Sequence, residues 1–170
     1  MLRKLAVTMV AAIAMLAGSA SAASAASATP DFGAQSRAAG LSAAQSQSLQ
    51  KRVDSVLAAI PGGRQVSSTE VRYDGLTVTF DPRSDNNARS LAISCSYGYF
   101  CITVNGTAFS FYTCQTWNLS NWTGNAPYNN NQTRGTVARA YGSSGGQVWS
   151  STAPASGTVN VTPWWSFKPC

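Results

Sequence analysis

The sequence predicts an all-β domain over residues 92–170, and three observations carry that prediction. From Ala92 onward the chain is rich in aromatic residues, Thr, Ser, Asn and Gly, in short alternating runs between turn residues and with no helical apolar stripe. All four cysteines lie in this half, which indicates a disulfide-stapled fold. Hydrophobic residues make up 44% of the chain and five are Trp, so we expect a packed core rather than disorder.

An export signal precedes the folded part of the chain. Arg3 and Lys4 form a basic start, the apolar run Leu5–Leu16 follows, and small residues in the A-x-A pattern extend to Ala28. The apolar run is too short to span about 30 Å of hydrocarbon, so we expect a signal peptide over residues 1–28 rather than an anchor. The sequence therefore predicts a secreted, extracellular protein with no membrane association after signal removal.

An N-terminal extension over residues 29–81 follows the signal, and its first part, Thr29–Gly40, is small, polar and aperiodic, which predicts a flexible leader. The capping-box pair Ser42 and Gln45, followed by an apolar stripe at helical spacing, predicts one helix over residues 42–60. Alternating residues on both sides of the Asp74-Gly75 turn predict a β-hairpin over residues 70–80.

The role of this extension stays open between two interpretations. A helix and a hairpin bury little surface alone, so the segment is either a pro-segment or docking arm, or an extension that covers a sheet edge. The composition of residues 82–91 predicts a linker, in which Arg83 and Arg89 are candidate processing points.

The four cysteines, Cys95, Cys101, Cys114 and Cys170, suit two disulfides because an exported chain matures in an oxidising compartment. Three pairings are possible, and the Cys-x5-Cys spacing is not that of a usual zinc site. We favour Cys95 with Cys101, which would clip a short loop. Cys114 would then pair with Cys170, tie down the C-terminus and contribute on the order of 4 kcal/mol.

Ionisable groups are scarce. The chain has no histidine, and the last of its six carboxylates is Asp85. The lack of imidazole excludes Ser-His and Cys-His nucleophile pairs and His-liganded metals, so we expect no enzyme and no cofactor. Signal removal lowers the formal net charge from +6 to +4, and the scattered cations that remain argue against nucleic-acid binding. Mild attraction to anionic cell-wall polymers is compatible with this charge.

Two motifs carry a family resemblance: C-x-x-G-x-x-C from Cys95 to Cys101, and N-N-Q-T-x-G-T-V-A-R from Asn130 to Arg139. Together with C-Q-T-W-N-L-S-N-W, which ends at Trp122, they resemble a βγ-crystallin Greek key. They are most similar to the secreted bacterial peptidase inhibitors of the streptomycete metalloproteinase inhibitor type. The match covers residues 92–142 well and the remainder loosely. It implies a βγ-crystallin-like Greek-key sandwich and inhibition of an extracellular peptidase.

A disulfide-pinned β-domain can hold a loop in an extended shape and limit the entropy lost on binding a peptidase. Two segments are candidate inhibitory loops: Gly124–Asn131, with Pro127 and Tyr128 near its centre, and Tyr141–Gln147, with its Gly/Ser run. The alternative for each is an ordinary surface loop.

The Trp residues offer a second kind of surface, because an exposed ring can stack on a glycan. Neighbours on a strand face opposite ways, so one of Trp164 and Trp165 should be core, as should Trp122. We take Trp165 as the candidate exposed binding residue.

A calcium motif is recognisable at Asn129, Asn130 and Thr133, because βγ-crystallin domains commonly bind calcium through two Asn/Asp residues followed by Thr/Ser and Ser. Arg134 stands where Ser is expected, and the domain has no carboxylate side chain. Ca²⁺ prefers oxygens with formal negative charge, so we interpret the motif as vestigial and expect no bound metal.

The leading hypothesis is a secreted, non-enzymatic, monomeric protein that blocks an extracellular peptidase, in particular a metallopeptidase, through a rigid loop. The alternatives are a cell-wall or glycan-associated binding module that uses an exposed aromatic residue, and a crystallin-type structural protein.

Overall fold

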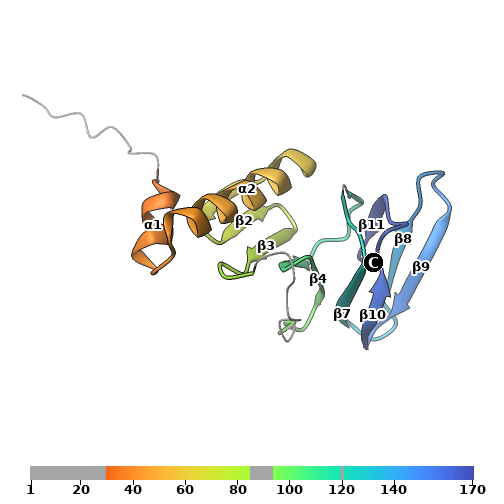
Figure 1. Ribbon diagram of the computed structural model, residues 1–170. Helices are drawn as coiled ribbons and strands as arrows, with labels where there is room; N and C mark the ends of the chain where they lie inside the picture. Colours follow the sequence, from red (N-terminus) through yellow and green to blue (C-terminus); the bar gives the residue numbers. More distant parts are fainter. Residues whose placement is uncertain (1–29, 85–93, 120) are drawn as a thin grey trace, which may run out of the picture. The chain divides into compact units, whose positions relative to one another are not determined.

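The computed structural model describes residues 30–84, 94–119 and 121–170 (Figure 1). The predicted signal peptide over residues 1–28 and most of the predicted linker over residues 82–91 lie outside the described residues. No helix in the described ranges is both long and apolar enough to cross a membrane.

The N-terminal part of the described chain contains helices α1 (Phe32–Ala38) and α2 (Ala43–Ala59). The predicted helix over residues 42–60 is confirmed, with both hydrogen bonds of the capping box: Gln45 N–H donates to Ser42 Oγ at 3.2 Å and Ser42 N–H donates to Gln45 Oε1 at 2.9 Å. The flexible leader predicted over Thr29–Gly40 is wrong for α1. That helix is capped by Asp31, whose Oδ1 accepts the Ala34 N–H at 2.9 Å.

The larger sheet has seven antiparallel strands in the order β1-β2-β3-β5-β4-β7-β10. Their bounds are β1 Arg64–Ser67, β2 Glu70–Tyr73, β3 Leu76–Phe80, β4 Tyr99–Val104, β5 Thr107–Phe111, β7 Asn125–Asn131 and β10 Ala155–Asn160. The predicted hairpin is β2–β3, and β1 extends it by one strand that the sequence analysis missed. Because β3 pairs with β5 from Leu76↔Phe111 to Phe80↔Thr107, this hairpin continues the sheet that contains the disulfide-bonded segment.

The smaller sheet has four antiparallel strands in the order β6-β11-β8-β9. Their bounds are β6 Trp117–Asn118, β8 Val137–Tyr141, β9 Gln147–Thr152 and β11 Ser166–Lys168. The two sheets exchange strands: β6 precedes β7 in the chain but lies in the smaller sheet, and β10 precedes β11 but lies in the larger one. Of strands β4–β7, only β6 lies in the smaller sheet, and of strands β8–β11, only β10 lies in the larger one.

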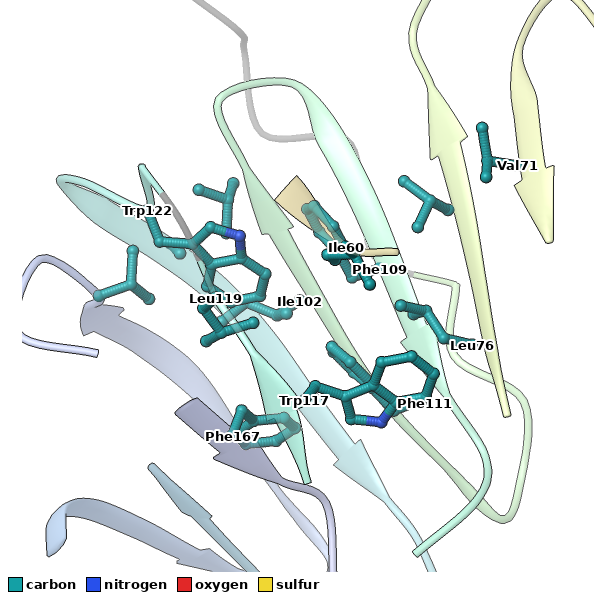
Figure 2. Packing of buried hydrophobic residues seen from close by; sticks show 14 of the residues in the cluster. Ile60, Val71, Leu76, Ile102, Phe109, Phe111, Trp117, Leu119, Trp122 and Phe167 are labelled. Atoms are coloured by element: carbon teal, nitrogen blue, oxygen red, sulfur yellow. The ribbon is translucent and has the colours of Figure 1, made fainter. Parts of the chain in front are cut away.

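One face of the seven-stranded sheet carries the core. Strand register places Tyr73, Leu76, Phe111 and Phe100 on this inner face. Phe100 and Phe111 pack against Phe167 of the smaller sheet at ring-centroid distances of 4.7 and 5.0 Å (Figure 2).

Helix α2 covers another part of the same face. It buries Leu49 and Val53, and the Tyr73 hydroxyl donates to the Val56 carbonyl at 3.4 Å. Helix α2 and the smaller sheet thus share one face of the larger sheet, and their buried side chains form a single cluster.

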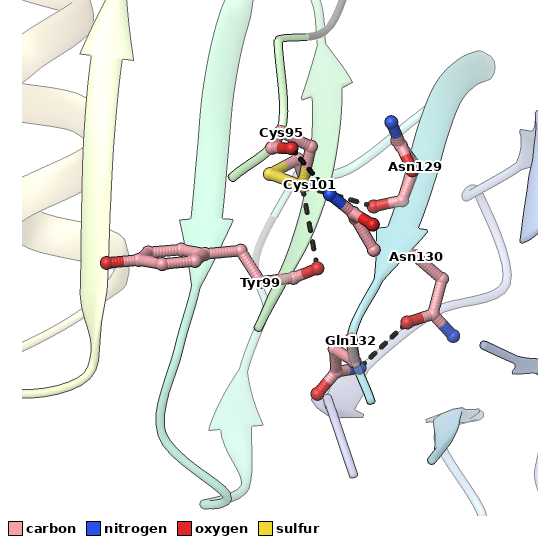
Figure 3. The surroundings of a disulfide bond; sticks show 7 residues. Cys95, Tyr99, Cys101, Asn129, Asn130 and Gln132 are labelled. Carbon is pink, nitrogen blue, oxygen red and sulfur yellow. Dashed lines mark hydrogen bonds between the residues drawn. A yellow bond between two sulfur atoms is a disulfide. The ribbon is translucent and has the colours of Figure 1, made fainter. Parts of the chain in front are cut away.

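Both favoured disulfides are present, Cys95–Cys101 and Cys114–Cys170, with Cα–Cα distances of 5.7 and 5.4 Å. The first lies beside β7, where Asn131 Nδ2 donates to the Cys95 carbonyl at 2.9 Å (Figure 3). The second joins Cys170, two residues after the end of β11, to the segment after β5.

Candidate functional site

Strand register divides the β-region into two opposite ends. Strand β7 begins at Asn125, which pairs with Asn160, and finishes at Asn131, which pairs with Tyr99 close to the first disulfide. We call the end that contains both disulfides the disulfide end. The other, which we call the Trp165 end, contains the β4–β5 turn and residues 121–124, 142–146 and 161–165.

Trp165 is the most exposed Trp of the domain, with 61% of its surface accessible, whereas its neighbour Trp164 is 3% exposed. Its backbone is fixed on both sides. The Trp165 N–H donates to the Tyr141 carbonyl, and the Trp165 carbonyl accepts the Leu119 N–H, both at 2.8 Å. The indole therefore projects from a backbone that is already ordered before any partner binds.

A tight hairpin tip joins β8 to β9. Gly142 N–H donates to the Gly146 carbonyl at 2.8 Å, and Gly145 N–H donates to the Gly142 carbonyl at 2.9 Å. A Cβ at Gly142 would lie 3.1 Å from Val148 Cγ1 and 3.7 Å from the Pro163 carbonyl oxygen, so the tip adjoins the segment that carries Trp165. We call residues 141–148 with Pro163 and Trp165 the Trp165 rim.

The rim has apolar and polar groups but no side-chain carboxylate, amine or guanidinium. Val148 adds a second exposed apolar side chain, 46% accessible. Val148 was not among the residues predicted from the sequence. It alternates with Trp149 and Ser151, which face inward on β9, so the signal for it was an apolar residue at an outward strand position. This surface can offer shape and apolar contact to a partner but no charge.

The first candidate loop is not a loop. Residues 125–131 form β7, which pairs with β4 on one side and β10 on the other. Tyr128 is half-buried, with its ring stacked on Phe100 at 5.9 Å and 11°, and Pro127 pairs with Thr158. The prediction of a candidate inhibitory loop over Gly124–Asn131 is therefore wrong, because two paired strands hold residues 125–131 extended. In the second candidate loop, residues 142–146 lie between β8 and β9 and belong to neither strand. This tip is the candidate loop that remains.

The residues of the calcium motif do not converge on one point. Asn130 is fully buried on the inner face, where its Nδ2 donates to the Ser151 carbonyl at 2.9 Å and its Oδ1 accepts Gln132 Nε2 at 2.9 Å (Figure 3). Asn129 alternates to the opposite face, and Thr133 follows the strand. The described residues contain no cluster of three or more His, Cys, Asp and Glu side chains.

A separate charged surface lies on the outward face of the smaller sheet. Ala138, Ala140 and Phe167 are buried, so Arg139 and Lys168 point outward. These two cations occupy directly paired positions on β8 and β11. Like charges in that arrangement oppose strand pairing.

Comparisons with protein-family models, with curated proteins and with solved structures each found no match to this chain.

Proposed function

We propose that the chain is a secreted, non-enzymatic βγ-crystallin-like protein that blocks an extracellular peptidase by inserting the Trp165 rim into its active-site cleft. Two sets of four consecutive strands, β4–β7 and β8–β11, support the Greek-key assignment. In each set the fourth strand lies beside the first: β7 pairs with β4, and β11 pairs with β8. The two disulfides and the sequence motifs at Cys95–Cys101 and Asn130–Arg139 support the family assignment.

The inhibitory role rests on one observation: the Trp165 indole is exposed, whereas hydrogen bonds fix the Trp165 backbone. A large aromatic side chain can fill the specificity pocket of a peptidase that accepts apolar residues, and such side chains dominate the binding energy of many interfaces. Because the Trp165 amide and carbonyl are already hydrogen-bonded, insertion costs little ordering entropy.

The test is inhibition of a panel containing a thermolysin-like metallopeptidase and two serine peptidases by the full secreted chain. We expect inhibition of at least one metallopeptidase, weakened on the order of 30-fold or more by Trp165→Ala. Tyr97→Ala is the matched control, since Tyr97 is 72% exposed but lies at the disulfide end. Absence of inhibition across the panel would contradict the proposal, as would equal losses in the two variants.

A second candidate function rests on the paired cations Arg139 and Lys168. An unfavourable like-charge pair on an open face is compensated by an anionic partner, and an anionic cell-wall polymer has that chemistry. Retention on teichoic-acid-containing walls should then fall with added salt and in Arg139→Gln/Lys168→Gln, while chitin retains neither form. Retention that is insensitive to both salt and the substitutions would remove this candidate.

A further inference from the structure

A hollow of about 370 Å³ lies where α2 meets the connection after β6 over the inner face of the larger sheet. We call it the α2 hollow. One wall is α2, with Lys51, Arg52 and Val56; the floor is formed by β4 and β5, and the far wall by Asn121 and Trp122. Its size is within the range of small-molecule sites. None of its lining residues belongs to the Trp165 rim.

The lining of the hollow is mixed, and its apolar part includes two aromatic rings. Phe109 and Trp122 line it with ring centroids 4.7 Å apart, and Ile60 from the end of α2 completes the apolar lining (Figure 2). All three side chains are at least nine-tenths buried in the core cluster, so their positions are fixed by packing on the other side. A ligand therefore meets a preformed apolar surface.

The α2 wall is cationic. Lys51 and Arg52 both line the hollow, and no carboxylate does. Arg52 Nη2 donates to the Asp81 carbonyl, while Arg52 Nε and Nη1 are buried without a hydrogen-bond partner among the described residues. Burial lowers the pKa of Arg52, although the nearby Asp81 carboxylate acts in the opposite direction. A partly desolvated guanidinium without an ion-pair partner in the part of the chain described here leaves positive potential beside the hollow.

Two amides with unusual backbone conformations complete the lining. Asn105 has φ 48° and Asn121 has φ 61°, and they are the non-glycine residues with positive φ in the described ranges. Both line the α2 hollow. Asn105 begins the two-residue Asn-Gly turn between β4 and β5, where type I′ geometry favours Asn at a positive φ. Each of the two amides supplies both a donor and an acceptor to the hollow.

We propose that the α2 hollow binds a small organic carboxylate with an apolar body, the body packed on Phe109 and Trp122 and the carboxylate facing Lys51 and Arg52. The apolar floor, the cationic wall and the two amides each recognise a different part of such a molecule. A neutral molecule would leave the cationic wall without a partner, and an amine would be repelled by it.

The probe is 3-phenylpropionate, with 3-phenylpropanamide and 3-phenylpropylamine as neutral and cationic analogues of the same body. Each is titrated into the full secreted chain while the Trp indole N–H resonances are followed by NMR, and Trp122→Phe assigns the Trp122 signal. We expect saturable binding of the carboxylate with a Kd of about 1 mM or tighter, centred on Trp122, and at least about tenfold weaker binding of the amine.

Two variants separate a specific site from general charge attraction. Lys51→Gln should weaken the carboxylate at least about fivefold, whereas Lys168→Gln, which removes an equal charge from the other sheet, should leave the affinity unchanged. Ala59→Phe fills the hollow from α2 and should abolish binding without unfolding the chain. Equal binding of carboxylate and amine, no saturation, shifts confined to other Trp signals, or equal effects of the two Lys variants would each overturn the proposal.

Discussion

The two ends of the β-region are built on opposite principles. At the disulfide end, two covalent links and side-chain hydrogen bonds tie the strands together: Asn131 reaches the Cys95 carbonyl, and Gln132 reaches the Pro169 carbonyl. At the Trp165 end the described residues contain no disulfide. Trp165 projects into solvent there, and Asn105 and Asn121 adopt left-handed conformations.

This difference indicates a division of labour within one small fold. A domain of this size gains stability efficiently from cross-links, since they lower the entropy of the unfolded chain. Concentrating them at one end fixes the register of the strands along their whole length. At the other end, hydrogen bonds of the backbone rather than cross-links hold Trp165 in place. Two of the three proposed binding surfaces, the Trp165 rim and the α2 hollow, include residues of this less constrained end.

Removal of the long-range disulfide should have the largest effect on stability, and it tests how the disulfide end is held together. Cys114→Ser with Cys170→Ser opens a link that spans 56 residues and should lower the free energy of unfolding by about 4 kcal/mol. Cys95→Ser with Cys101→Ser opens a link across 6 residues and should cost about 2 kcal/mol. Urea unfolding followed by Trp fluorescence measures both. A larger loss from the short link would show that native packing around Cys95, rather than chain entropy, sets the stability of this end.

Asn130 tests the hydrogen-bonded part of the disulfide end. Its side chain joins β7 to Ser151 of the other sheet, and its truncation leaves a buried carbonyl without a partner. We expect Asn130→Ala to cost about 2 kcal/mol and Asn129→Ala, on the opposite face, less than about 0.5 kcal/mol. Calcium should leave both unfolding curves in place. A calcium-dependent rise in stability that Asn130→Ala abolishes would restore a metal-binding role for the motif.

Tyr73 links α2 to the sheet and should make stability depend on alkaline pH. Burial raises the pKa of Tyr73 to about 12, from an ordinary value of 10.0. The neutral phenol is thus favoured in the folded state, so its contribution is complete below pH 10 and is lost as the pH rises from 10 toward 12. Thermal unfolding across this window should show a steeper fall for the native chain than for Tyr73→Phe. Parallel curves would mean that Tyr73 ionises freely in the folded protein.

Local signals in the sequence were sufficient for some elements and not for others. The capping box at Ser42 and the Asp74-Gly75 turn place α2 and the β2–β3 hairpin, because each signal is satisfied by residues within the element itself. Helix α1 has no apolar stripe. It depends on the Asp31 cap and on contacts with distant chain, such as the bond from the Ser68 N–H to Gln35 Oε1.

Strand β7 shows the same limit more strongly. Its Asn-rich composition favours a turn, and it is extended because β4 and β10 pair with both of its edges. Alternation between Trp164 and Trp165 correctly indicates one buried and one exposed ring. Trp165 and the Tyr141–Gln147 segment were separate candidates from the sequence, but their place in one rim could not be predicted this way. The same holds for the α2 hollow, since only the strand order brings its elements together.

The smallest expected effect on stability is at the two left-handed Asn residues. Glycine at Asn105 or Asn121 relieves the cost of a positive φ but adds freedom to the unfolded chain, so the two terms should cancel to within about 0.5 kcal/mol. Because both side chains line the α2 hollow, the same variants should weaken 3-phenylpropionate binding at least about threefold. Urea unfolding and NMR titration of each variant measure the two quantities separately. A loss of more than about 1 kcal/mol in the free energy of unfolding, with unchanged ligand affinity, would show that these amides stabilise the fold. Their end of the β-region would then have a stabilising role, as the disulfide end has.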